Sequence, residues 1–335
     1  LTDDRRDICG NRLSALAICS NFLPDARMAL YTPTIAVLLP CYNEALTIAR
    51  VIADFRAALP EAHIYVFDNN STDESASIAR AAGATVASVP FQGKGNVVRR
   101  MFADVDADIY VMADADSTYD VSRARELVTP ILNGTADTVV AVRDGAKSAF
   151  PPAHVFGNQL FNVIVQRLFG RGLRDIFSGY RSFSRRFVKS FPAHSERFEI
   201  ETEMSIFMLE QRIPMMEISM HYGERPAGSF SKLHTYRDGA RILITILRLF
   251  KEARPFAFFS ILASMMALLS MLLALPIIIT WSQTGLVDRQ PTLILCTGIA
   301  VLAALTFLGG MMLDSLARTY RETRHLRYLN VPPRR

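Results

Sequence analysis

The chain has 335 residues, half of them hydrophobic, and a formal net charge of +5. This length allows roughly two domains, and so high an apolar fraction argues against a purely soluble protein and calls for a search for membrane segments. The basic excess comes without a zinc-finger spacing or other nucleic-acid signature, so it excludes a nucleic-acid partner and favours attraction to anionic lipid.

The N-terminal residues show no folding pattern. Residues 1–27 lack a clean hydrophobic period, a signal-peptide architecture and an initiating Met, whereas Met28 would serve as a natural start. We therefore expect residues 1–33 to form a leader that is non-native or disordered.

From residue 34 onward, short apolar runs alternate with amphipathic segments of helical length. The predicted strands are residues 34–40, 63–68, 84–90, 108–114 and 136–143, and the predicted helices between them are residues 44–59, 72–83, 93–105 and 120–134. This alternation predicts an α/β fold with a mostly parallel sheet flanked by helices. Ligands of such sheets bind beyond the carboxyl ends of the strands.

Polar clusters follow the first four predicted strands. They read LPCYNE at residues 39–44, FDNNSTD at 67–73, GKG at 93–95 and VMADADSTYD at 111–120. We expect them to line one site, because the carboxyl ends of parallel strands share an edge of the sheet. Asp114 and Asp116 there form a pair of hard oxygen donors suited to Mg²⁺ or Mn²⁺ on substrate phosphates.

Each of these side chains also has a structural interpretation. Asp120 fits a helix cap, Glu44 fits a first-turn acid, Asn69 and Asn70 fit a turn, and Lys94 fits a solvated charge. Their joint occurrence, in order and at successive strand ends, favours the ligand-binding interpretation.

The second half of the chain carries membrane signals. Residues 154–173 and 235–254 mix aliphatic faces with Arg and Lys, which is typical of helices in the membrane interface, although ordinary surface helices remain an alternative. Residues 255–281 and 291–313 carry no charge, and each exceeds the roughly 20 residues needed to cross a bilayer. They predict a hairpin of two transmembrane helices.

Basic residues indicate the orientation of this hairpin. Arg248, Lys251 and Arg254 precede the first span and six arginines follow the second between residues 318 and 335, whereas the connecting loop has only Arg289. The positive-inside rule then places both flanks in the cytoplasm. We predict a multi-pass protein of the inner (cytoplasmic) membrane with a cytoplasmic catalytic domain.

The strand-end clusters resemble those of the family 2 glycosyltransferases, whose fold is the Rossmann-like GT-A fold, over residues 34–143. The resemblance implies a glycosyltransferase that uses a nucleotide-sugar donor, with uridine as the expected base, and Mg²⁺ or Mn²⁺ as cofactor. It implies metal binding by Asp114 and Asp116, and donor binding by Pro40, Tyr42, Asn43, Glu44, Asp68, Asn70, Lys94 and Asp114.

Two later stretches narrow the resemblance. RDIFSGYRSFSRR at residues 174–186 and YGERPAGSFSKLHTYRDG at 222–239 resemble segments of the polyprenyl-phosphate glycosyltransferases, a group that includes the dolichyl-phosphate mannose synthases. The resemblance implies an undecaprenyl-type polyprenyl phosphate as acceptor and inversion at the anomeric carbon. It implies acceptor-phosphate binding by Arg181, Arg225, Ser231 and Lys232, and catalytic roles for Asp116, Asp175 and Arg181. Arg and Lys suit phosphate contacts.

Two features depart from this picture or stand outside it. Thr118 occupies a position where the mannose synthase group often has Gln, two residues after the Asp-x-Asp pair. The stretch FEIETEM at residues 198–204 places Glu199, Glu201 and Glu203 at a spacing of two, so they would not share a helix face. We interpret Glu203 as a helix-surface acid, with a site role as the alternative.

The expected mechanism depends on the acceptor. A lipid phosphate is already an anion and needs no strong base, so catalysis would depend on stabilising the departing nucleoside diphosphate. One alternative is transfer to a lipid or sugar hydroxyl, which would need a base such as Glu203 or Asp175. Others are a catalytically silent membrane scaffold and a processive polysaccharide synthase. The synthase is disfavoured because that class resembles a pattern with Gln-x-x-Arg-Trp in the acceptor region, whereas the only tryptophan here, Trp281, lies in a predicted span.

These predictions divide the chain into successive parts. They are a leader (1–33), a GT-A domain (34–234), an interfacial helix (235–254), two transmembrane helices (255–313) and a basic cytoplasmic tail (314–335). The expected partners are the sugar nucleotide, the polyprenyl phosphate and membrane lipids. The identity of the sugar and the formation of a homo-oligomer stay open.

Overall fold

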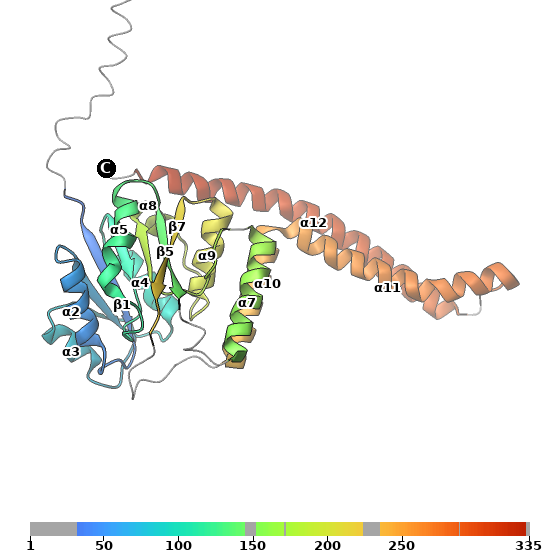
Figure 1. Ribbon diagram of the computed structural model, residues 1–335. Coiled ribbons are helices and arrows are strands. Elements are labelled where there is room, and N and C mark those ends of the chain that lie inside the picture. Colours follow the sequence, from blue (N-terminus) through green and yellow to red (C-terminus); the bar gives the residue numbers. More distant parts are fainter. Residues whose placement is uncertain (1–31, 145–151, 171, 224–234, 288, 333–335) are drawn as a thin grey trace, which may run out of the picture.

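The computed structural model describes residues 32–144, 152–170, 172–223, 235–287 and 289–332. An α/β domain is followed by a pair of long helices that project away from it, and the second of these returns to the domain (Figure 1). The leader predicted over residues 1–33 lies almost entirely outside the described residues.

A seven-stranded sheet forms the centre of the domain, in the order β3-β2-β1-β4-β6-β5-β7. All neighbours are parallel except β6, which runs antiparallel to both β4 and β5. All five predicted strands are confirmed, as is the mostly parallel sheet, whereas β6 and β7 were not predicted. The strands are β1 (Ile35–Cys41), β2 (His63–Asp68), β3 (Thr85–Ser88), β4 (Ile109–Met112), β5 (Thr138–Asp144), β6 (Arg181–Ser184) and β7 (Met215–His221).

Helices cover both faces of this sheet. Successive residues of β1 point to opposite faces, so Val37 packs into one buried cluster with α2 and α5, and Leu38 packs into another with α4, α8 and α9. Both faces are buried, which explains why β1 is almost continuously apolar. The helices of the domain are α2 (Ile48–Ala58), α3 (Ser75–Ala81), α4 (Lys94–Asp104), α5 (Ala124–Leu132) after the short 3₁₀ helix η3 (Val121–Arg123), α7 (Pro152–Phe169), α8 (Arg185–Ser190) and α9 (Ile200–Gln211).

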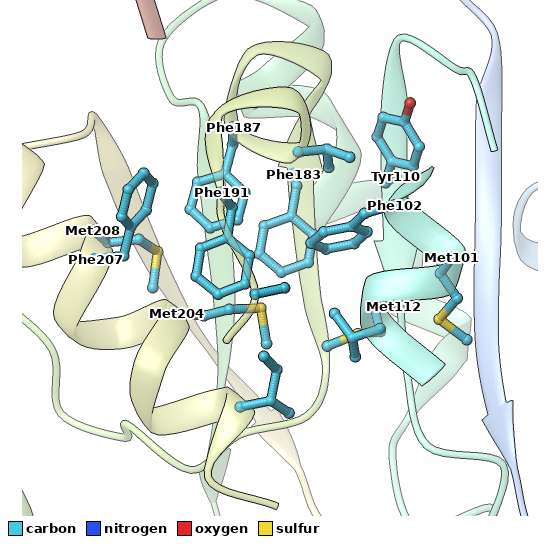
Figure 2. Packing of buried hydrophobic residues seen from close by; sticks show 14 of the residues in the cluster. Met101, Phe102, Tyr110, Met112, Phe183, Phe187, Phe191, Met204, Phe207 and Met208 are labelled. Carbon is cyan, nitrogen blue, oxygen red and sulfur yellow. The ribbon is translucent and has the colours of Figure 1, made fainter. Parts of the chain in front are cut away.

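Aromatic rings join β6, α8 and α9 in the second cluster (Figure 2). Phe183 stacks on Phe187 with ring centroids 4.7 Å apart, and Phe187 stacks on Phe191 at 5.6 Å. Phe207 of α9 meets both Phe187 and Phe191 edge to face. Offset and edge-to-face pairs of this kind add to the free energy gained by burial, so α9 is held firmly against the sheet.

The described residues from 235 onward form three further helices: α10 (Thr235–Ala253), α11 (Pro255–Thr284) and α12 (Gln290–Asn330). Helices α11 and α12 are long and apolar enough to cross a membrane. In the most apolar 18-residue stretch of each helix, only 17% is buried in the structure. They pack against each other, with the rings of Phe256 and Phe307 5.6 Å apart and Ser270 Oγ donating to Cys296 O at 2.8 Å. This arrangement agrees with the predicted hairpin.

The last part of α12 differs from the prediction of a basic tail. Residues 314–330 continue the helix without interruption and pack on α8 and α9 (Figure 1). Tyr328 is buried, its hydroxyl pairs with Asp137, and the Arg186 guanidinium lies 5.0 Å from the centre of its ring. Arg324 of α12 also lies 3.7 Å from Glu210 of α9. These contacts bury one side of the segment, so it forms part of the folded domain.

Candidate active site

The carboxyl ends of β1 and β2 carry the first predicted donor residues. Pro40 lies in β1 and Asp68 ends β2, in a register that pairs Cys41 with Asp68. Asp68 is buried, and its Oδ1 has no hydrogen-bond partner among the described residues. Because buried polar atoms are nearly always satisfied, Asp68 is a candidate for contact with a ligand.

The loops after β1 and β2 are tied to each other. Asn43 and Asn70 both adopt left-handed backbone conformations, with φ of 52° and 64°, which asparagine tolerates better than most residues. The Asn43 side-chain oxygen accepts from the Thr72 amide at 2.8 Å, and the Glu44 amide donates to Ser75 Oγ at 2.8 Å. Tyr42 precedes them and is half-buried. The six donor residues predicted at the ends of β1 and β2 and in the loops that follow therefore lie along one edge of the sheet.

The Asp-x-Asp pair follows β4 at the same edge. Thr47, in the loop after β1, donates to the backbone oxygen of Ala115, between the two aspartates, at 2.7 Å. Asp116 is only 3% exposed, and its Oδ1 accepts hydrogen bonds from Thr118 Oγ1 at 2.6 Å and from the Thr118 amide at 3.2 Å. Thr118 therefore fixes the orientation of Asp116. Asp120 accepts from the Ser122 amide and caps η3, as its structural interpretation predicted.

Lys94 lies between two carboxylates. Its ammonium group pairs with Asp114 and, at 2.5 Å, with Glu201 Oε1. Burial lowers the pKa of Lys94, but the charges of Asp114 and Glu201 outweigh it and raise that pKa above its ordinary value. Burial raises the pKa of Glu201, against the opposing charge of Lys94. Lys94 is not the solvated charge of the structural interpretation.

Glu201 and Glu203 differ from their sequence-based interpretation. Both are 4% exposed, because α9 is enclosed on nearly all sides, so Glu203 is not a helix-surface acid. Glu203 accepts from the amides of His194 and Ser195 at 2.9 and 2.7 Å. Glu201 reaches Lys94 instead, so the two acids do serve different faces. Their spacing predicted that difference but not their burial.

Gly179 belongs to the sequence SGYR at residues 178–181, and its backbone lies against the Lys94–Asp114 pair. A Cβ at this position would lie 2.5 Å from Asp114 Oδ2 and 2.9 Å from Lys94 Nζ. The Gly179 amide donates to Tyr119 Oη at 2.9 Å, which holds the segment in place. A side chain here would force the Lys94–Asp114 pair to move, so glycine is favoured at this position.

Arg181 occupies a different place from the one predicted for a phosphate ligand. The residue is fully buried, and its guanidinium donates to the backbone oxygens of Ser178 and Ile176 at 2.7 and 2.8 Å and to Ser205 Oγ at 2.9 Å. Burial lowers the pKa of Arg181 to about 10. In this arrangement Arg181 supports the segment that carries Gly179 and presents no exposed surface to a phosphate.

Asp175 forms a buried ion pair that the sequence did not predict. Its two oxygens accept from Arg143 Nε and Nη2 at 2.7 and 2.8 Å. Burial raises the pKa of Asp175, but the hydrogen bonds and charge of Arg143 outweigh it and hold that pKa below its usual range. The Arg143 guanidinium also lies 5.5 Å from the centre of the Tyr222 ring. A carboxylate held in this way is a poor proton acceptor, which argues against a general-base role.

Three predicted acceptor residues, Arg225, Ser231 and Lys232, lie outside the described residues. The described residues just before them, Tyr222 and Gly223, contact the region of the Asp-x-Asp pair. The Gly223 amide donates to Thr118 O at 2.8 Å, and Tyr222 pairs with Tyr119 in an isolated bridge. The segment after β7 therefore starts beside the candidate metal ligands.

The donor set fits a hard divalent cation that is shared with a substrate. Within the described parts of the chain, no group of three or more His, Cys, Asp or Glu residues could hold a metal ion. Asp114 and Asp116 supply carboxylate oxygens at the end of β4. Mg²⁺ in phosphate-handling sites is commonly held by one or two carboxylates together with substrate phosphates, so the number and type of these ligands are compatible with such a cation.

Comparison with known proteins identifies the class. The sequence profile of glycosyl transferase family 2 matches residues 36–191. Glycosyltransferase AglJ of Haloferax volcanii is 31% identical over 291 residues, which cover 86% of this chain and 95% of AglJ. Dolichyl-phosphate hexose transferase of the same organism is 28% identical over 222 residues, covering 66% of this chain and 95% of the relative. The chain belongs to glycosyl transferase family 2 and is a glycosyltransferase.

A solved structure supports the fold assignment. Glucosyl-3-phosphoglycerate synthase from Mycobacterium tuberculosis, in complex with Mn²⁺, UDP-glucose and phosphoglyceric acid, superposes with a TM-score of 0.54 and 23% identity, covering 64% of this chain and 79% of that chain. At this identity the similarity concerns the fold alone. It agrees with the predicted GT-A fold.

Proposed function

We propose that this glycosyltransferase transfers a sugar from a UDP-sugar to a polyprenyl phosphate at the cytoplasmic surface of the inner membrane. The donor would lie along the carboxyl ends of β1, β2 and β4, between the loop of residues 40–44 and the Asp-x-Asp pair. Asp68 Oδ1, which has no hydrogen-bond partner among the residues that the structure describes, supports a ligand at that edge. The UDP-glucose and Mn²⁺ in the complex of the mycobacterial synthase support uridine and a divalent cation.

The observation that favours a phosphate acceptor over a hydroxyl acceptor is that both candidate bases are already hydrogen-bonded within the protein. A sugar or lipid hydroxyl would need a base, for which Asp175 and Glu203 were the candidates. Asp175 is held by Arg143 through two hydrogen bonds, and Glu203 accepts from two backbone amides. A phosphate acceptor is already an anion and needs neither residue. The relative named dolichyl-phosphate hexose transferase supports the same acceptor class.

The exposed apolar helices support a membrane location. Helix α11 has 30 residues, and at about 1.5 Å per residue it exceeds the roughly 30 Å hydrocarbon core. Val163 of α7 and Ile244 of α10 are 51% and 65% exposed, so these two packed helices present apolar side chains as interfacial helices would. The basic residues beside the hairpin support a cytoplasmic location of the α/β domain through the positive-inside rule.

The proposed reaction is a direct displacement. An oxygen of the acceptor phosphate forms a bond to the anomeric carbon while the bond from that carbon to the nucleoside diphosphate breaks, with inversion. Asp114 and Asp116 would hold Mg²⁺ or Mn²⁺, which when bound supplies positive charge for the departing diphosphate. Lys94 lies beside Asp114 and adds a cation on the same side. Arg225 and Lys232 would bind the acceptor phosphate.

A transfer assay tests this function. Membranes that contain the protein are supplied with a panel of radiolabelled UDP-sugars and Mg²⁺ or Mn²⁺, and lipid products are extracted. We expect label in an acid-labile lipid that survives mild alkali, as a polyprenyl-phosphate sugar does. Label confined to alkali-labile glycerolipid would support the hydroxyl acceptor instead, and absence of any lipid product would refute transfer to lipid.

A matched pair of variants tests the metal assignment. Asp116→Asn is expected to abolish transfer while the protein stays in the membrane, because one of the two metal ligands loses its charge. Asp120→Asn alters a nearby carboxylate that caps η3, so it should keep most of the activity. Unchanged turnover in Asp116→Asn would contradict the metal role.

A further inference from the structure

Lys94 forms an ion pair with Asp114, a side chain that the proposed metal would also bind. Its ammonium group pairs with Asp114, one of the two predicted metal ligands, and also lies 2.5 Å from Glu201 Oε1. The Lys94 and Glu201 side chains are 9% and 6% exposed, whereas the Asp114 side chain is 30% exposed. Glu201 is therefore the buried partner of Lys94, and Asp114 is the partner on the open side.

A divalent cation and Lys94 compete for Asp114. Both are positive, and without Glu201 the ammonium group of Lys94 would stay buried with no counter-ion once a cation took Asp114, which is strongly destabilising. Resting on the proposed function, we infer that Glu201 is a positioning residue that retains Lys94 when the metal takes Asp114. Lys94 then changes partners without leaving the site, and it stays beside the diphosphate.

The hydrogen-bonding capacity of Glu201 fits this exchange. Glu201 Oε2 is buried and has no hydrogen-bond partner in the described part of the chain. An ammonium group has three donors, so the N–H that leaves Asp114 can be accepted by Oε2 while Oε1 keeps its present bond. Both carboxylate oxygens of Glu201 would then be satisfied in the metal-bound state.

The backbone holds Glu201 against Lys94. The start of α4 packs tightly on the segment before α9, since a Cβ on Gly93 or Gly95 would come within 2.2 Å of a backbone oxygen of that segment. The Asn96 amide donates to Glu196 O at 3.2 Å. Glu201 and Lys94 thus belong to one rigid unit, and only the contact with Asp114 is open to exchange.

Binding of Mn²⁺ alone, measured by water-proton relaxation on the full-length protein in detergent, tests the exchange. Lys94→Met removes the competitor, so we expect tighter binding by roughly fivefold, or about 1 kcal/mol. Glu201→Gln leaves Lys94 with Asp114 as its charged partner, so binding should weaken by a similar factor. Glu210→Gln alters a glutamate of the same helix that pairs with Arg324, and it should bind Mn²⁺ like the wild type.

The double variant Lys94→Met/Glu201→Gln separates exchange from a simple electric field. If Glu201 acts through Lys94, the double variant should match Lys94→Met, because Glu201 has no ammonium left to retain. If Glu201 acts only through its charge, the two single effects should add, and that result would overturn the inference. The double variant removes both buried charges, so it also serves if Lys94→Met alone unfolds: it should then bind Mn²⁺ about fivefold more tightly than the wild type, whereas wild-type affinity would mean that the two effects add and would overturn the inference.

The same measurement distinguishes failure of the two proposals. Wild-type protein that binds Mn²⁺ no better than Asp116→Asn would refute the metal site and the exchange with it. Normal wild-type binding that neither Lys94→Met nor Glu201→Gln changes would refute the exchange and leave the proposed function standing.

Discussion

Gly179→Ala tests the packing of the candidate site. The new Cβ would lie 2.5 Å from Asp114 Oδ2, and an ordinary contact begins at 3.4 Å, so the carboxylate would have to retreat by about 0.9 Å. This movement would also disturb Lys94, which pairs with Asp114 and whose Nζ would lie 2.9 Å from the new Cβ. Overpacking of this kind typically costs about 1–3 kcal/mol.

The expected result is a loss of function that exceeds the loss of folding. If the displaced Asp114 no longer holds its cation, this cost lowers kcat/KM for the sugar nucleotide by roughly 5- to 150-fold. The assay is initial-rate transfer to lipid, together with thermal unfolding of the purified protein. We expect Gly179→Ala to stay folded at the assay temperature.

The chain offers a matched control at Gly223, beside the same loop. There the nearest atom to an added Cβ is Thr118 O at 3.8 Å, which is an ordinary contact, so Gly223→Ala should be close to wild type. The reasoning would be refuted if Gly179→Ala kept wild-type kcat/KM and Mn²⁺ affinity. Equal losses in the two variants would also refute it.

Three further perturbations test other contacts. Asp175→Asn should lower the free energy of unfolding at pH 7 by about 3–5 kcal/mol, because it removes one charge of a largely buried ion pair. The pKa of Asp175 is lowered in the fold, so its contribution is present above the ordinary carboxyl pKa of about 3.9 and is lost as the pH falls through the lowered value. Urea unfolding should show the two proteins converging below about pH 4, and a constant gap would contradict the ion pair. Thr118→Val should weaken Mn²⁺ binding about tenfold through loss of the hydrogen bond to Asp116, whereas Thr118→Ser should not, and equal affinities in both would contradict that role. Tyr328→Ala should speed tryptic cleavage at the arginines of residues 314–330, whereas Tyr328→Phe, which keeps the ring, should resist it; no difference between them would show that the ring does not hold the segment.

Local sequence was sufficient to predict the strands that carry the site. β1, β2 and β4 are short, apolar and followed by polar loops, so their period and their ends are visible without tertiary information. β6 was missed because three of its four residues, RSFS, are polar, and because its antiparallel insertion between β4 and β5 depends on contacts from distant parts of the chain.

The partners of the charged groups could not be predicted in the same way. Glu201 and Arg143 meet Lys94 and Asp175 across 107 and 32 positions of sequence, and no local period records such a pair. The sequence did offer one signal for Glu201, since an acid in a helix as apolar as α9 is buried only when it is paired. Arg181 was assigned to phosphate from the resemblance of residues 174–186 to a known group and from its residue type, whereas its burial and its backbone partners depend on the fold.

The unbroken course of α12 links the distance of the α/β domain from the apolar part of the helix to the rotation of the domain about the helix axis. Each residue of an α-helix adds a rise of about 1.5 Å and a turn of about 100°. Gain or loss of one residue between the apolar part of α12 and Tyr328 would therefore rotate the side of the helix that carries Tyr328 away from α8. Only a change of about seven residues, close to two full turns, would restore the phase, and it would shift the domain by roughly 10 Å. The length of this segment can thus vary only in coarse steps.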